Sequence, residues 1–128
     1  MQKVALVVDD NGSVRAYVKG ALESEGFRTL EADDGELGLE LVRKFGSDID
    51  LVISDIQMPK LDGIQLANSV RAEFPKIPII LVSGYVDVAL QNQPGVEFIA
   101  KPFLPSTLLN IVRKMVAMAK TATPDSMS

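Results

Sequence analysis

The chain has 128 residues and a formal net charge of −4, and it contains neither cysteine nor histidine. The length predicts one domain, and the missing residue types exclude disulfides, thiolate catalysis, Cys-based zinc sites, a Ser-His-Asp triad and a histidine phosphoryl carrier. No apolar stretch approaches the ~20 residues that span a bilayer, and no basic-then-apolar leader begins the chain. Without a Lys/Arg-rich block, direct binding to nucleic acid is not expected. We therefore expect a cytoplasmic protein without membrane insertion.

Two aspartates end the first apolar run. Residues 4–8 are all aliphatic, and such a run without polar alternation predicts a strand covered on both faces, as in a parallel sheet. Asp9 and Asp10 follow it directly. Asn11 or Ser13 can then cap an amphipathic helix that ends at Gly26.

The next two elements are a weakly alternating strand over residues 27–32, which suits a sheet edge, and a second helix. Asp33, with Glu36 three residues later, resembles a capping box for that helix. Its predicted buried positions are Leu37, Leu41, Val42 and Phe45.

The second half of the chain repeats the alternation. Strands are predicted over residues 50–54, 79–82 and 96–100, with Asp55 directly after the first of them. Helices are predicted at three places, namely residues 64–74, residues 86–93 and residues 106–120. The tail, residues 121–128, lacks periodicity and is predicted to be disordered.

This order predicts an α/β fold, a three-layer α/β/α sandwich around a five-stranded parallel sheet. The right-handed crossover rule and the three apolar central strands favour the flavodoxin-like strand order 2-1-3-4-5. No linker or repeat divides the chain, so residues 1–120 are expected to form one domain.

Polar residues of particular kinds follow four of the predicted strands. Asp9 and Asp10 follow the first, Asp55 the third, Ser83 the fourth and Lys101 the fifth. In an open parallel sheet all these strand ends lie on the same rim. Three converging carboxylates repel one another, so they require a cation, a shared proton or open solvent.

At these positions the chain resembles the receiver domain of bacterial two-component response regulators, from Val4 to about Lys120. The matching segments are Val7-Val8-Asp9-Asp10, Asp55-Ile56-Gln57-Met58-Pro59 with Asp62-Gly63, Val82-Ser83-Gly84 and Lys101-Pro102-Phe103. The resemblance implies a phosphorelay switch rather than an enzyme. Asp55 would accept a phosphoryl group from a histidine kinase or histidine phosphotransfer protein, and the switch would then control a downstream protein partner.

The resemblance also implies a cofactor and further roles. Mg²⁺, or Mn²⁺ in its place, would be held by Asp10, Asp55 and the backbone carbonyl of Gln57, with help from Asp9 directly or through water. Lys101 would contact the transferred phosphoryl group, and Ser83 would hydrogen-bond it. The switch residues would be Ser83 with the aromatic Phe98, and the side chains of Gln57 and Tyr85 would flank the path of the hydrolytic water.

The chain departs from the family pattern in one interval. Lys101 follows Ser83 by 18 residues, fewer than is usual, so the helix predicted over residues 86–93 is short. Two segments also resemble receivers attached to hybrid histidine kinases, namely Val82-Ser83-Gly84-Tyr85 and Lys101-Pro102-Phe103-Leu104-Pro105. A free-standing regulator and one receiver of a larger protein are both compatible with the sequence.

Two other functions compete with the phosphoacceptor switch. One is a Mg²⁺-dependent phosphohydrolase with an aspartyl nucleophile after the first strand, but that chemistry favours a second acid two residues beyond the nucleophile, where Asn11 or Gly12 stands. The other is a constitutive docking module with a vestigial acid site. The joint presence of four residues argues against a vestigial site, namely Asp10, Asp55, Ser83 and Lys101.

Overall fold

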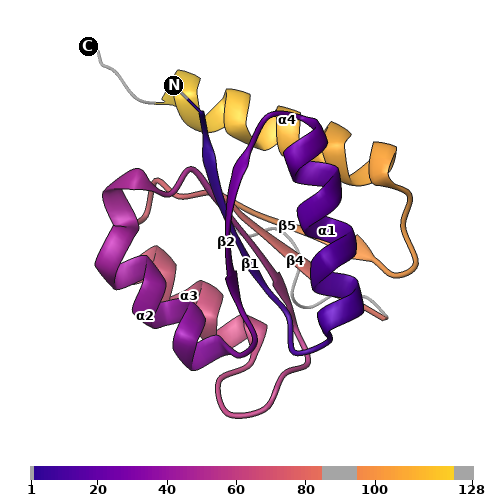
Figure 1. Ribbon diagram of the computed structural model, residues 1–128. Helices are drawn as coiled ribbons and strands as arrows, with labels where there is room; N and C mark the ends of the chain where they lie inside the picture. Colours follow the sequence, from indigo (N-terminus) through magenta and orange to yellow (C-terminus); the bar gives the residue numbers. More distant parts are fainter. Residues whose placement is uncertain (1, 85–94, 123–128) are drawn as a thin grey trace.

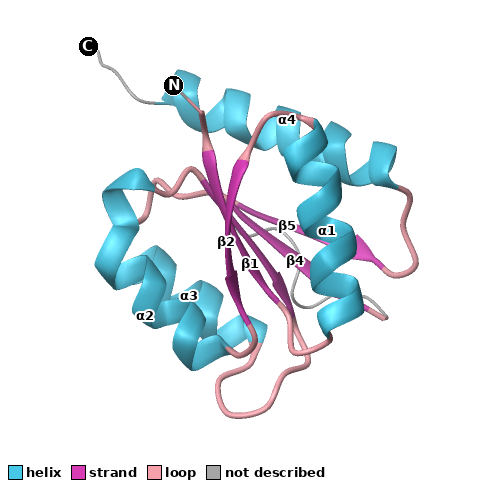
Figure 2. Cartoon of the chain, in the orientation of Figure 1, coloured by secondary structure: helices cyan, strands magenta, loops and turns pink. Residues whose placement is uncertain are grey.

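Five parallel strands form the centre of the molecule in the computed structural model, which describes residues 2–84 and 95–122 (Figure 2). The strands run in the order β2-β1-β3-β4-β5, and every neighbouring pair is parallel. The elements in chain order are β1 (Val4–Val8), α1 (Gly12–Ser24), β2 (Arg28–Ala32), α2 (Gly35–Phe45), the short 3₁₀ helix η1 (Gly46–Asp48), β3 (Leu51–Asp55), α3 (Gly63–Glu73), β4 (Ile79–Ser83), β5 (Val96–Ala100) and α4 (Pro105–Ala122). The predicted flavodoxin-like order is confirmed.

Helices cover both faces of this sheet (Figure 1). α1 and α4 pack on one face, where alternate strand residues such as Ala5 and Val7 join their apolar side chains. α2 and α3 pack on the other, where Leu6 and Val8 are buried. Because both faces are covered, β1, β3 and β4 are buried along nearly their whole length, and polar residues occur only at the carboxyl ends of β3 and β4. The edge strand β2 is only partly buried.

The ends of α1 follow the sequence closely. Asn11 is the N-cap, and its side-chain oxygen accepts hydrogen bonds from the backbone N–H groups of Ser13 and Val14 at 2.9 and 3.2 Å. At the other end Gly26 has a φ of +93°, and its N–H and that of Phe27 bond back to carbonyls of the last turn at 3.0 Å. This pair of bonds is a Schellman motif, which glycine permits because it lacks a Cβ.

The start of α2 differs from the prediction. Asp34, not Asp33, is the N-cap, and its carboxylate accepts the N–H of Leu37 at 2.8 Å. Leu37 was predicted to be buried but is 37% exposed. The helix turns Gly38 toward the sheet instead, where a Cβ would lie 3.0 Å from a methyl carbon of Val8. The predicted apolar face was therefore wrong at this position, because close helix–sheet approach selects glycine there.

The capping box occurs in α3 rather than α2. The Asp62 carboxylate accepts the Gln65 N–H at 2.9 Å, and the Gln65 side chain accepts the Asp62 N–H at 3.0 Å. These reciprocal bonds satisfy two otherwise free donors at the helix start. They also hold the connection between β3 and α3 in place above the sheet rim.

The remaining boundaries differ from the prediction by one or two residues. α4 extends to Ala122, so it includes the first two residues of the predicted tail. Tyr85, the helix predicted over residues 86–93 and the end of the tail (residues 123–128) lie outside the described residues. Across residues 2–84 and 95–122, none of the helices has the length and apolar character needed to cross a bilayer.

Candidate functional site

The carboxyl ends of β1 and β3 bring three aspartates together. Parallel pairing sets Val8 beside Ser54, so the residues that follow on each strand end at the same rim. One carboxylate oxygen from each of Asp9, Asp10 and Asp55 lies within 4.8 Å of the others. Asp9 and Asp55 are buried, while Asp10 is exposed. The predicted convergence of acids from two separate strands is therefore observed.

Lys101 reaches this acidic cluster from β5. Its Nζ lies 3.5 Å from Oδ1 of Asp55, and its side chain is 30% exposed. Its backbone N–H donates to the carbonyl of Ser83 at 2.7 Å, which fixes the start of the β5–α4 connection against the end of β4. Among the described residues, this cluster holds three carboxyl groups beside the one ammonium group of Lys101.

Asp9 carries the clearest electrostatic cost in this cluster. Burial raises the pKa of its carboxyl, and the negative charges of Asp55 and Asp10 act in the same direction. The N–H of Asn11, which donates to Asp9 Oδ1 at 2.9 Å, and the charge of Lys101 oppose the rise in pKa. Because the net effect disfavours the ionised carboxylate, the site favours a bound cation over an empty, fully charged state.

Ser83 and Phe98 lie on the neighbouring strands β4 and β5, and Ser83 is the one at the strand end. Ser83 is buried at the end of β4, one residue beyond Val82, which pairs with Asp55. Phe98 pairs with Leu81 across β4 and β5 and is partly buried against the core on the α2/α3 face. Ser83 therefore places a hydroxyl at the rim. Phe98 lies two residues before the end of β5, behind that rim.

The connection after β3 forms a shallow hollow beside the acids. Its volume is about 480 Å³, and it is lined by Asp10, Ile56, Gln57, Met58, Pro59 and Asp62. Gln57 is exposed there. The hollow therefore joins the predicted backbone ligand Gln57 to the predicted side-chain ligand Asp10.

Gly63 sets how close this connection comes to β3. Its N–H donates to the Ile56 carbonyl at 2.9 Å, and a Cβ at this position would lie 2.2 Å from the carbonyl oxygen of Asp55. Any side chain would therefore push α3 away from the end of the strand. The sequence prediction assigned no role to this close approach, although the Asp62-Gly63 pair after the strand is the local signal for it.

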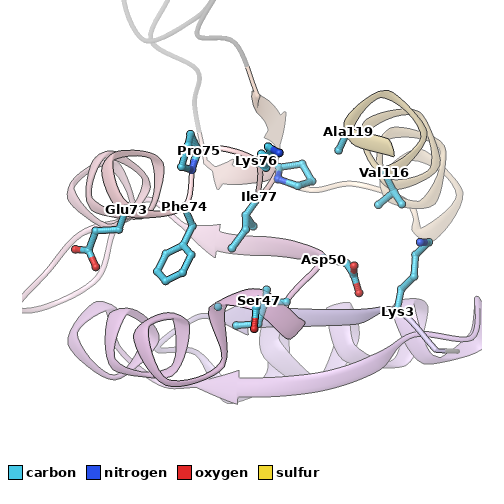
Figure 3. Close-up of a pocket in the computed structure, with 13 residues that line it drawn as sticks. Lys3, Ser47, Asp50, Glu73, Phe74, Pro75, Lys76, Ile77, Val116 and Ala119 are labelled. Atoms are coloured by element: carbon cyan, nitrogen blue, oxygen red, sulfur yellow. The ribbon is translucent and has the colours of Figure 1, made fainter. Parts of the chain in front are cut away.

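A second cavity, of about 620 Å³, lies at the amino ends of the strands, opposite the acidic cluster (Figure 3). Its lining includes Lys3, Asp50 and Pro78, which directly precede β1, β3 and β4. The carboxylate of Asp50 accepts the N–H of Val4 at 2.8 Å, so it is already hydrogen-bonded within the fold. Because open parallel sheets place their chemistry at the carboxyl ends of the strands, the acidic cluster is the candidate site, although this cavity is larger.

Comparison with known proteins points to one family. The model of the response regulator receiver domain matches residues 5–113. The sensor kinase CckA of Brucella abortus is 36% identical over 115 residues, which are 87% of this chain and 12% of the kinase. The response regulator receiver protein CpdR of Brucella abortus is 32% identical over 123 residues, which are 93% of this chain and 100% of CpdR.

A solved structure of the CheX–CheY–BeF3–Mg²⁺ complex from Borrelia burgdorferi matches with a TM-score of 0.82 and 28% identity, covering 88% of this chain and 87% of that chain. This chain spans between 12% and 58% of the length of CckA and of three other curated relatives. The relatives thus include a kinase much longer than this chain and a protein of about the same length, CpdR.

Proposed function

Since this chain belongs to the response regulator receiver domain family, we propose that it is a phosphoacceptor switch of a two-component system. Residues 1–120 form the receiver domain, and Asp55 accepts a phosphoryl group from a histidine kinase or a histidine phosphotransfer protein. The donor histidine must come from the partner, because this chain contains none. Phosphorylation changes the conformation of the domain and thereby controls a downstream protein. The observation that carries the proposal is the gathering of Asp9, Asp10 and Asp55 beside Lys101.

In the proposed reaction Asp55 is the nucleophile. A carboxylate oxygen of Asp55 forms a bond to phosphorus as the bond from phosphorus to the donor's imidazole nitrogen breaks, and the electron pair of that bond returns to the nitrogen. The product is an acyl phosphate on Asp55. Lys101, 3.5 Å from the attacking carboxylate, places a positive charge where the phosphoryl oxygens arrive.

The donor atoms at the rim fit Mg²⁺. Asp10, Asp55 and the backbone carbonyl of Gln57 would be ligands, with Asp9 bound directly or through water, and oxygen ligands of this kind are the ones Mg²⁺ prefers. When bound, the ion neutralises charge as an anionic carboxylate approaches an anionic phosphoryl group. Mn²⁺ accepts the same ligands and is a candidate substitute. The Mg²⁺ in the related CheY complex supports this assignment.

The same geometry suggests how the switch operates. The hydroxyl of Ser83, at the end of β4, donates a hydrogen bond to a phosphoryl oxygen after transfer and so favours a second position of the β4 end. Phe98, on the neighbouring strand, turns inward as the hydroxyl moves. Gln57, at the rim of the hollow, and Tyr85, which lies outside the described residues, are the two side chains that we propose to flank the path of the water that hydrolyses the acyl phosphate, and thereby to set how long the phosphoryl group persists.

A direct test is incubation with acetyl phosphate and Mg²⁺, followed by intact-mass measurement. The protein should gain the mass of one phosphoryl group, and Asp55→Asn should abolish the gain while leaving the fold intact. Asp48→Asn, at an exposed aspartate in η1, is the matched control and should be labelled like the wild type. An unlabelled wild type would contradict the proposal, and sustained turnover of phosphate monoesters would favour a phosphohydrolase instead.

A further inference from the structure

Tyr17 is 43% exposed, and it nevertheless makes two contacts with a distant part of the chain. It lies in the middle of α1, and its hydroxyl donates a hydrogen bond to the backbone carbonyl of Phe103 at 2.7 Å. Its ring also meets the Phe103 ring edge-on, with the centroids 5.8 Å apart and the planes at 63°. Edge-to-face aromatic pairs of this geometry are favourable beyond the area they bury. We call these two contacts the Tyr17–Phe103 latch.

The latch holds the chain segment that carries Lys101. Phe103 lies two residues after Lys101, in the connection between β5 and α4, outside both elements. The segment is tied at its start by the Lys101 N–H, which donates to Ser83 at 2.7 Å, and Pro102 has no N–H to donate. The bond to Tyr17 therefore adds a hydrogen bond on the far side of this short segment, at the Phe103 carbonyl.

The other end of the latch is the helix that begins at the acids. α1 starts at Gly12, directly after the acidic pair and its cap, and Arg15 on the same helix donates to the backbone carbonyl of Asp9 at 2.7 Å. α1 is thus bonded to the chain at Asp9 through Arg15 and to the lysine-bearing segment through Tyr17. α1 therefore connects the end of β1, where the acids lie, with the segment that carries Lys101.

The position of Lys101 is sensitive to such a constraint. Its Nζ lies 3.5 Å from Asp55 Oδ1, so the two groups are close without being in tight hydrogen-bond contact. A displacement of the backbone at residues 101–103 moves the ammonium relative to the phosphoryl position. Misplacement of a catalytic group by a fraction of its contact distance is enough to slow a reaction that depends on positioning.

We propose that Tyr17 is a positioning residue for phosphoryl transfer, which acts by holding the β5–α4 connection so that Lys101 faces Asp55. The proposal rests on the proposed function of Asp55. It adds a residue on the surface of α1 that does not touch the reacting atoms. The hydroxyl of Tyr17 carries the effect through its bond to Phe103, and the ring contact supports it.

The test is Tyr17→Phe, which removes only the hydroxyl and keeps the ring. Single-turnover labelling of Asp55 is measured over a range of acetyl phosphate concentrations at saturating Mg²⁺. The limiting rate constant should fall by about three- to tenfold, the effect of losing one positioning hydrogen bond. The dissociation constant for Mg²⁺ should stay close to wild type, and the midpoint of thermal unfolding should fall by no more than a few degrees, the cost of one hydrogen bond. Ser24→Ala, which removes a hydroxyl bonded to the Ala21 carbonyl at the far end of α1, is the control and should not change the rate.

A double-mutant cycle shows whether Tyr17 acts through Lys101. In the Lys101→Ala background, Tyr17→Phe should cause no further loss of rate, because the group that it positions is gone. A Tyr17→Phe rate equal to wild type, or the same fold loss with and without Lys101, would overturn the latch while leaving the phosphoacceptor role intact. A wild type that takes no label contradicts the phosphoacceptor role itself, so the two failures are distinguishable.

Discussion

Adjacent residues at the end of β1 have opposite environments. Asp9 continues the strand direction and is 3% exposed, whereas Asp10 faces solvent. Alternation along an extended chain explains the difference, since successive side chains point to opposite sides. The buried acid carries the raised pKa, with burial as its largest cause. The exposed acid is the more accessible ligand for an arriving cation.

At this scale we predict that Asp9→Asn stabilises the metal-free protein at neutral pH. The pKa of Asp9 is higher in the folded than in the unfolded state, so folding disfavours the ionised carboxylate once the pH rises through the folded pKa. Asparagine removes that charge and can still accept the N–H of Asn11. The thermal unfolding midpoint without Mg²⁺ should rise by a few degrees at neutral pH.

The gain from Asp9→Asn should disappear at a pH below the ordinary pKa of aspartate, where the carboxyl is protonated in both states. Asp33→Asn is the control, because Asp33 is exposed and outside the acidic cluster. A lower midpoint for Asp9→Asn at neutral pH would show that the charge is compensated in the metal-free site.

Among the elements, the helices differ in how closely they approach the sheet. Gly63 at the start of α3 lies against the Asp55 carbonyl, and Gly38 in α2 lies against Val8. Gly20, in the exposed part of α1, has no atom within 4 Å of where a Cβ would stand. Glycine is thus favoured where a helix comes close to the sheet, and it costs stability where no other element is near.

This contrast predicts opposite effects of one substitution. Gly63→Ala should destabilise the fold by about 1–3 kcal/mol, because its Cβ meets backbone that cannot yield cheaply. Gly20→Ala should stabilise it by about 0.5–1 kcal/mol, since alanine is the better helix former. Urea unfolding of both variants checks the pair. A Gly63→Ala variant as stable as the wild type would mean that α3 can move away from β3 without cost.

For the whole molecule, the site is assembled from parts that are distant in sequence. The acids end β1 and β3, Ser83 ends β4 and Lys101 follows β5, so the site exists only when the sheet is complete. A cation that binds these groups together binds the folded chain and not the unfolded one. Binding and folding are therefore linked.

The linkage predicts that Mg²⁺ raises the free energy of unfolding. At a concentration 100 times the dissociation constant the gain should be about 2.7 kcal/mol, from mass action alone. Asp10→Asn should lose most of this gain. Asp48→Asn should keep it, because Asp48 lies in η1, before the amino end of β3. Urea unfolding with and without Mg²⁺ at matched ionic strength measures the difference. An equal Mg²⁺ effect in all three proteins would place the ion elsewhere.

The sequence alone determined the order of elements, the parallel sheet and the rim on which the acids, Ser83 and Lys101 lie. It could do so because a strand buried on both faces must be apolar throughout, and because parallel strands end on the same side. Local patterns also narrowed the cap of α1 to Asn11 or Ser13 and identified the helix end at Gly26, since both depend on residues within a few positions.

Only the tertiary structure decided the features that depend on contacts between distant segments. Asp34 rather than Asp33 caps α2, and the close approach of this helix to Val8 places Gly38 rather than Leu37 against the sheet. Tyr17 and Phe103 are 86 residues apart, so no local pattern relates them. Periodicity reports which face of an element is buried, whereas the distance between two packed elements is set by the side chains of both.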